Sequence, residues 1–228
     1  MTVLVLTPIE REFTSLTEEL TSLGLPSSSV SHGQISGRSY ADGSLFVALG
    51  GLGKAQFGIQ TQHLLDHIDG VSLAICAGTA GGLGPGLAIG DVVVGTSTVE
   101  HDFNRAFSKR PLPSFEGSKP HIRGLGSLEV PSQEGFALHF GLIASGDEDI
   151  ADAARARQLR DSTGALAVAW EGAGGARAAK FSNIPYLELR GISDNADHDA
   201  STQFFENIPS AMKNVAFVLR KILDMPPP

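Results

Sequence analysis

Continuous apolar runs alternate along the chain with segments in which apolar residues recur at helical spacing. Residues 2–7 and 71–77 are mainly apolar and show no alternation, which is typical of strands buried on both faces. Residues 10–23 place Phe13, Leu16 and Leu20 on one side of a helix. The same reasoning predicts strands at 35–40, 44–49, 91–98, 138–144, 165–170 and 185–192, and helices at 54–67, 150–161, 172–181 and 208–223. This alternation predicts an α/β fold.

Two segments follow neither pattern. Residues 24–33 are rich in glycine, serine and proline, which predicts a loop. Residues 104–134 contain several prolines and glycines and a local cluster of basic residues, which predicts a long surface excursion or a partner-contacting arm. We find neither an internal repeat nor a linker that divides the chain, so residues 1–228 are predicted to form a single domain.

The net charge and the single cysteine limit the partners and the cellular compartment that we expect for this protein. The net charge of -8 and the sequence pI near 5.3 argue against a nucleic-acid partner or an anionic membrane surface. The single cysteine, Cys76, excludes an intrachain disulfide, and the apolar start is too short for a signal peptide. No apolar run approaches the length of a bilayer span. We therefore expect a cytoplasmic protein.

Two further motifs are weak. The segment Gly51-Leu52-Gly53-Lys54 lacks the spacing of a phosphate-binding loop, and Ala55 stands where a magnesium-binding hydroxyl is needed. Three aspartates and His198 within residues 194–199 offer oxygen and nitrogen ligands, but such a cluster is more often a polar turn. We predict no metal and no other cofactor.

Four segments, taken together and in this order, resemble one family. They are Pro8-Ile9-Glu10-Arg11-Glu12; Ala77-Gly78-Thr79-Ala80-Gly81-Gly82 followed by Gly90-Asp91-Val92-Val93; Ser145-Gly146-Asp147; and Trp170-Glu171-Gly172-Ala173 followed by Arg190-Gly191-Ile192-Ser193-Asp194-Asn195-Ala196-Asp197. Their order and spacing resemble the nucleoside phosphorylase superfamily, and within it the methylthioadenosine/S-adenosylhomocysteine nucleosidases, over residues 3 to about 222. The resemblance implies a mixed sheet, partly closed into a barrel and flanked by helices, in a homodimer.

The resemblance also implies an activity and a catalytic set. A purine nucleosidase uses water to cut the bond between a base and a ribose, as in nucleoside catabolism and methionine salvage. Asp194 would protonate the leaving purine at N7, which requires a raised pKa. Glu12 would accept a proton from the attacking water. Glu171 would accept hydrogen bonds from the ribose hydroxyls. A carboxylate is costly to bury without a partner, so a purely structural glutamate is not expected in this apolar, glycine-rich segment.

Other matched positions would line the substrate. Thr79 would lie near the ribose and the water, and Ser193 beside the acid, although both hydroxyls are equally expected in simple turns. Four apolar residues match positions around the 5′ substituent or serve as plain core: Ile9, Leu52, Phe107 and Phe204.

Three positions depart from the adenosine-cleaving pattern and leave the substrate open. Asp149 stands where an aromatic or apolar residue usually packs on the base, beside Ile150, which we also expect at the substrate. Ala169 stands where a glutamate is common, and Trp170 replaces a methionine that packs on the ribose. A carboxylate at 149 would accept a hydrogen bond from a base N–H or point to solvent. A futalosine-type hydrolase is therefore a sibling possibility.

The same fold also carries out phosphorolysis, which requires arginines that bind a phosphate dianion. Cys76 occupies one position where phosphorylases carry such an arginine, and Glu12 lies near another. A carboxylate there repels phosphate, so we predict hydrolysis. The alternatives are a phosphate-dependent phosphorylase and a non-catalytic nucleoside-binding module, although a pure binder has no use for a water-activating carboxylate.

Overall fold

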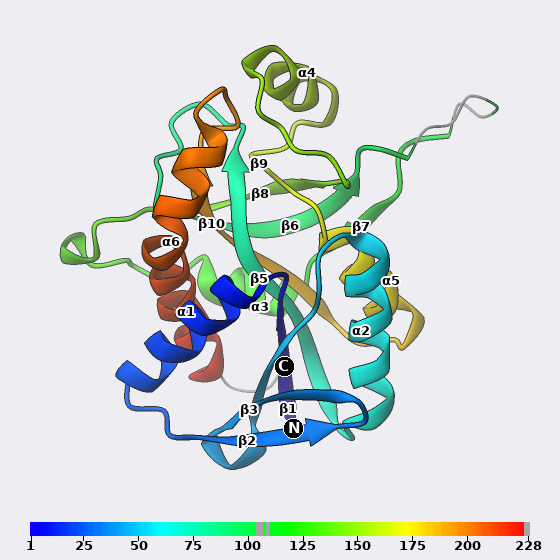
Figure 1. Ribbon diagram of the computed structural model, residues 1–228, viewed down its shortest axis with the longest axis vertical. Coiled ribbons are helices and arrows are strands. Elements are labelled where there is room, and N and C mark those ends of the chain that lie inside the picture. The colour runs from blue at the N-terminus through cyan, green and yellow to red at the C-terminus, as the bar shows by residue number, and fades with distance from the viewer. Residues whose placement is uncertain (104–106, 108–109, 226–228) are drawn as a thin grey trace.

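A computed structural model of the chain describes residues 1–103, 107 and 110–225. Within them a ten-stranded mixed sheet has helices on both faces (Figure 1). The strands are β1 (Thr2–Thr7), β2 (Ser27–His32), β3 (Ile35–Tyr40), β4 (Leu45–Leu49), β5 (Val71–Gly82), β6 (Val92–Glu100), β7 (Ser114–Glu116), β8 (Leu138–Ser145), β9 (Ala167–Ala169) and β10 (Tyr186–Asp194). The helices are α1 (Glu10–Ser22), α2 (Lys54–His67), α3 (Lys119–Leu125), α4 (Ala153–Thr163), α5 (Gly172–Phe181) and α6 (Ala200–Leu223).

Part of the sheet closes on itself. The strand order is β10-β6-β8-β9-β5-β1-β4-β3-β2, and β10 also pairs with β5. Strands β5, β10, β6, β8 and β9 therefore form a closed ring, while β1, β4, β3 and β2 extend from it as an open arm. This arrangement confirms the predicted mixed, partly barrel-like sheet flanked by helices.

Apolar side chains fill both faces of the arm. In β1, Leu4 and Leu6 pack toward Phe57 and Ala176 on α2 and α5, whereas Val5 faces the cluster built by α1 and α6. Successive residues of a strand point to opposite faces, so an unbroken apolar run is what a strand covered on both sides requires. Figure 1 shows the two helix pairs on either side of the arm.

The structure departs most from the sequence prediction in three segments. The loop predicted at 24–33 is wrong, because Ser27–His32 forms β2, a largely exposed strand paired with β3 that has no apolar face to reveal it. The predicted excursion at 104–134 contains β7 and α3, while residues 104–106 and 108–109 lie outside the described part. Helix α6 begins at Ala200 rather than 208 and continues through Pro209. None of the described helices has both the length and the apolar character to cross a membrane.

Close packing of α2 on α5 brings together the two loops that precede these helices. A Cβ atom at Gly174 would lie 2.1 Å from the Lys54 carbonyl oxygen, so no side chain fits there. Gly58 faces the same turn, with a virtual Cβ 3.1 Å from the Gly174 oxygen. The contact places Gly53, just before α2, beside Glu171, just before α5.

Gly174→Ala is expected to force the two helices apart. Overpacking of this kind costs about 1–3 kcal/mol of unfolding free energy. Urea unfolding measures it, with Gly126→Ala as the control, because a Cβ at Gly126 meets nothing closer than 3.4 Å and its φ is -62°. Equal unfolding midpoints for the two variants would contradict the proposed close packing.

Candidate active site

A cavity of about 550 Å³ opens where β1, β5, β9 and β10 end, beside the first turns of α1 and α6. Its size is that of a site for a small organic ligand. All but one of the residues predicted for the site line it: Ile9, Glu12, Leu52, Thr79, Asp149, Ile150, Trp170, Glu171, Ser193, Asp194 and Phe204. The exception is Phe107, whose side chain is fully exposed and lies outside the cavity lining.

Glu12 is held in the first turn of α1 by backbone and hydroxyl donors. Its Oε1 accepts hydrogen bonds from the Thr79 amide (2.6 Å) and hydroxyl (2.7 Å), and its Oε2 accepts one from the Ile9 amide (3.2 Å). Burial raises its pKa to about 7, against the opposing effects of Thr79 and Arg190. One acceptor position of Oε2 remains for another donor, such as a water molecule.

Asp194 ends β10 on the same cavity. Its Oδ2 accepts a hydrogen bond from the Ser193 hydroxyl (2.8 Å), and its Oδ1 accepts one from the Ala196 amide (2.9 Å). Burial raises the pKa of this carboxyl, and the nearby Asp197 adds to the effect. A raised pKa keeps a carboxyl protonated at higher pH, as a proton donor requires.

The glycines of β5 allow both carboxylates to approach the strand. A Cβ atom at Gly78 would lie 3.0 Å from Glu12 Oε1, and one at Gly81 would lie 3.0 Å from Asp194 Oδ1. Contacts of 3.0 Å are tighter than most Cβ contacts, so a side chain at either position would have to displace the carboxylate, which gives the glycine spacing of this segment a steric reason. The carboxyl groups of Glu12 and Asp194 thus approach β5 at positions three residues apart.

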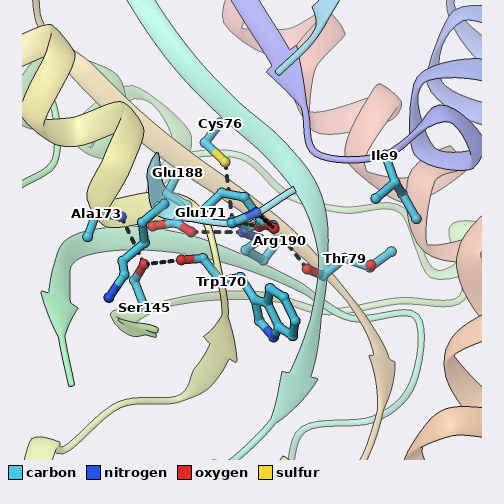
Figure 2. A network of polar contacts seen from close by, with 12 residues as sticks. Ile9, Cys76, Thr79, Ser145, Trp170, Glu171, Ala173, Glu188 and Arg190 are labelled. Carbon is cyan, nitrogen blue, oxygen red and sulfur yellow. Dashed lines mark hydrogen bonds and ion pairs between the residues drawn. The ribbon is translucent and has the colours of Figure 1, made fainter. Parts of the chain in front are cut away.

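Glu171 lies at the turn between β9 and α5. Its Oε1 accepts a hydrogen bond from the Gly53 amide (3.3 Å), and its Oε2 pairs with Nη2 of Arg190 (3.3 Å). Burial raises its pKa, and Arg190 opposes that rise. The turn itself is fixed by Ser145, whose hydroxyl donates to the Trp170 carbonyl (2.7 Å) and accepts from the Ala173 amide (2.9 Å), as Figure 2 shows.

Sequence reasoning missed the cation at the centre of the site. Arg190 is buried, lines the cavity, and lies between Glu171, Cys76 and Thr79 (Figure 2). Its Nε donates to Oε1 of Glu188 (2.8 Å), which is buried as well. A glutamate and an arginine two residues apart in an apolar strand point to the same face, so this spacing was a usable signal of a buried ion pair.

The three positions that depart from the adenosine-cleaving pattern all lie at the cavity. The buried Ala169, which ends β9, and Trp170, which follows it, line the cavity, while Asp149 lies on its exposed rim next to the buried Ile150. Leu52 is half-exposed at the mouth. These side chains are placed to contact whatever the cavity binds.

The acidic cluster at Asp197, His198 and Asp199 lies before α6. Its candidate ligand atoms lie within 4.8 Å of one another, and His198 and Asp199 are exposed. The Asp199 amide donates to Oδ1 of Asp197 (3.0 Å), so the cluster forms a polar turn at the start of the helix.

A closed mixed sheet with a carboxylate-rich cavity at its strand ends defines an α/β enzyme fold that holds a small ligand in loops. The family model described as the phosphorylase superfamily matches residues 2–224, and the chain belongs to this superfamily.

The relatives that are similar to this chain include nucleosidases. The chain is 31% identical over 190 residues to an aminodeoxyfutalosine nucleosidase of Helicobacter pylori, covering 81% of this chain and 82% of that protein. It is also 31% identical to a 5′-methylthioadenosine/S-adenosylhomocysteine nucleosidase of Actinobacillus succinogenes, covering 81% and 80%. The crystal structure of a Helicobacter pylori 5′-methylthioadenosine/S-adenosylhomocysteine nucleosidase with butyl-thio-DADMe-Immucillin-A superposes with a TM-score of 0.85 at 26% identity, covering 98% of each chain.

Glu12→Gln is expected to change how stability depends on pH. A carboxyl whose pKa is raised from 4.5 to about 7 on folding contributes stability that is fully present below pH 4.5 and is lost progressively as the pH rises to about 7. Glutamine has no proton to lose. The unfolding free energy of the variant minus that of the natural protein should therefore be roughly 2–3 kcal/mol larger at pH 8 than at pH 5.

Urea unfolding at both pH values measures that difference, and Glu18→Gln, on the exposed side of the same helix, is the control. A stability difference between Glu12→Gln and the natural protein that is the same at both pH values would show that Glu12 is not buried as described.

Proposed function

We propose that this protein hydrolyses the N-glycosidic bond of a purine nucleoside, with a substituent on the 5′ carbon, and releases the free base. The observation that carries the proposal is that two buried carboxyl groups with raised pKa values, Glu12 and Asp194, line one cavity. Cleavage of a glycosidic bond by water needs one group that donates a proton and one that accepts it.

In the proposed reaction, protonated Asp194 donates its proton to N7 of the purine. The bond from the sugar carbon to N9 breaks, and its electron pair leaves with the base, which departs neutral. Water attacks the cationic sugar, and the ionised Glu12 accepts the proton that this water loses. Glu171 accepts hydrogen bonds from the ribose hydroxyls, and proton exchange with solvent restores both carboxyl groups.

The charge of the cavity favours water over phosphate. Its described lining contains five acidic side chains, Glu12, Glu148, Asp149, Glu171 and Asp194, and a single basic one, Arg190. The guanidinium is already paired with Glu171 and Glu188. A phosphate dianion would meet net repulsion at short range in a partly dry site.

The named relatives support two substrate classes, thio-substituted adenosines and futalosine-type nucleosides. Ile9, Leu52 and Phe204 provide an apolar environment for a 5′ substituent. Trp170 supplies a large ring to the same cavity, and Asp149 supplies an acceptor that would favour a base or 5′ group with an N–H donor. We propose hydrolysis of a substrate from one of these two classes.

A panel of purine nucleosides, including methylthioadenosine, S-adenosylhomocysteine and aminodeoxyfutalosine, tests the function by release of free base with and without phosphate. We expect release from at least one member, at a rate independent of phosphate. Asp194→Asn should lower kcat by roughly 10²–10⁴-fold, because it removes the acid. Asp161→Asn, an exposed change on α4, should leave kcat unchanged.

A strict phosphate requirement would replace hydrolysis by phosphorolysis. Tight nucleoside binding without any release of base over hours would instead favour a binding module.

We further propose that the protein acts in the cytoplasm as a homodimer. Ile59 and Phe181, both largely exposed, line a groove between α2 and α5, and Phe107 is fully exposed as well. Large apolar side chains exposed together are typical of interaction sites. Phe107 would then lie at the partner's cavity rather than its own. The one cysteine, Cys76, is free and buried, as suits a reducing compartment.

Mass measurement tests the assembly, with an expected value twice the 23.9 kDa of one chain. Ile59→Arg should yield a folded monomer with reduced activity, because a charge in the apolar groove opposes association. Phe107→Ala should keep the dimer and weaken substrate binding. A natural protein that is monomeric and fully active would contradict both expectations.

A further inference from the structure

A second buried glutamate lies behind the arginine of the active site. Arg190 reaches the cavity, whereas Glu188, two residues earlier on β10, is absent from its lining. Figure 2 shows the two side chains close together. Both side chains are 1% exposed. The mechanism proposed above assigns no role to Glu188, and the cost of burying a carboxylate is offset only by its partners.

Both oxygens of Glu188 are engaged. Oε1 accepts the hydrogen bond from Nε of Arg190 (2.8 Å), and Oε2 accepts one from the Thr98 hydroxyl on β6. The start of α5 leaves space for the carboxylate, because a Cβ at Gly172 would lie only 2.2 Å from Oε2. The remaining donors of Arg190 are thereby directed elsewhere: Nη1 to the Thr79 carbonyl (3.2 Å) and Nη2 to Glu171 (3.3 Å).

The acidic groups around the Arg190 guanidinium form two sets, those that line the cavity and those that do not. Glu12 from α1 and Glu171 from the start of α5 line the cavity, and each has its proposed task with water or ribose. Cys76 on β5 lies 3.2 Å from Nη2 and stays a neutral thiol, because burial raises its pKa well above the usual range. Among the described neighbours, Glu188 is the carboxylate that a substrate cannot reach.

We propose that Glu188 is a positioning residue for the reaction. It fixes the plane of the Arg190 guanidinium through Nε and balances the charge of Arg190 from behind. Glu171 and Glu12 then keep unused acceptor positions for ribose and water. The proposal rests on the proposed function, since it explains how this cavity tolerates the cationic sugar formed during bond cleavage. An unbalanced guanidinium beside that cation would raise the barrier.

Glu188→Gln keeps the shape while removing the charge: the amide oxygen accepts from Arg190 Nε, and the amide NH₂ donates to the Thr98 hydroxyl. In the folded variant we expect kcat to fall by at least about tenfold, with KM changing less than about threefold, because the charge of Arg190 opposes the transition state more than the bound substrate. Glu100→Gln is the matched control. Glu100 is also a buried glutamate, and it pairs with Lys54 and Arg177 outside the cavity lining.

Titration of the Glu12 carboxyl gives a second measurement, which does not depend on catalytic turnover. Glu12 is faced by Thr79 on β5, by Arg190 on β10 and by Glu171 at the start of α5. Arg190 and Thr79 lower the pKa of Glu12, and Glu171 raises it. Glu188 itself faces Arg190, Thr98 and the buried neutral groups of Cys76 and Tyr186.

Removing the negative charge at 188 leaves Arg190 unbalanced, so the Glu12 carboxyl should titrate about one pH unit lower. The ¹³C resonance of that carboxyl, assigned by its loss in Glu12→Gln, reports this shift. Glu188→Asp retains the charge and should retain the titration of the natural protein, even where the shorter side chain slows turnover.

A folded Glu188→Gln protein with unchanged kcat and unchanged Glu12 titration would overturn the proposal. Should Glu188→Gln fail to fold, Thr98→Val, which removes one support of the carboxylate, takes its place, and unchanged kcat in that variant would count equally against it. Absence of base release by the natural protein would refute the proposed function alone, because the titration still decides the role of Glu188.

Discussion

The site is organised around one guanidinium that is buried together with the carboxylates it balances. Glu12, Glu171 and Glu188 come from separate elements, and without a cation among them their mutual repulsion in a dry interior would be severe. Arg190 contacts two of the three and attracts the other. Each element that carries a carboxylate is thus tied electrostatically to the middle of β10, inside the closed ring of strands.

Two chemically similar carboxyl groups are distinguished by the charges nearest to them. Burial is the leading cause of the raised pKa of both Glu12 and Asp194, and each accepts hydrogen bonds that oppose the rise; Arg190 also lowers the pKa of Glu12, whereas Asp197 raises that of Asp194. A neighbouring positive charge favours the ionised form of a carboxyl group, and a neighbouring negative charge favours the protonated form. The local environments therefore bias two similar side chains toward the different tasks of accepting and donating a proton.

Most of the fold was predictable because each buried strand and helix has a strong apolar pattern. Helix α5, Gly172–Phe181, was predicted with its observed bounds despite its glycines. Strand β2 was missed because, as an edge strand, it buries no face. Residues in short, ordered motifs, such as Glu12 and Asp194, were found by resemblance. Glu188 was not, because it lies outside those motifs: its spacing from Arg190 was the one available signal, and its contact with Thr98 forms only when β6 pairs with β10.

The position of β2 has a consequence for solubility. At one end the sheet closes on itself, but at the other end the backbone of β2 faces solvent, where a second chain would otherwise add a strand. The sequence there is Ser27-Ser28-Ser29-Val30-Ser31-His32, and its side chains are mostly exposed. Hydroxyl groups offer an incoming strand no apolar surface to bury, so this run of serines protects a ten-stranded protein from growing into an aggregate.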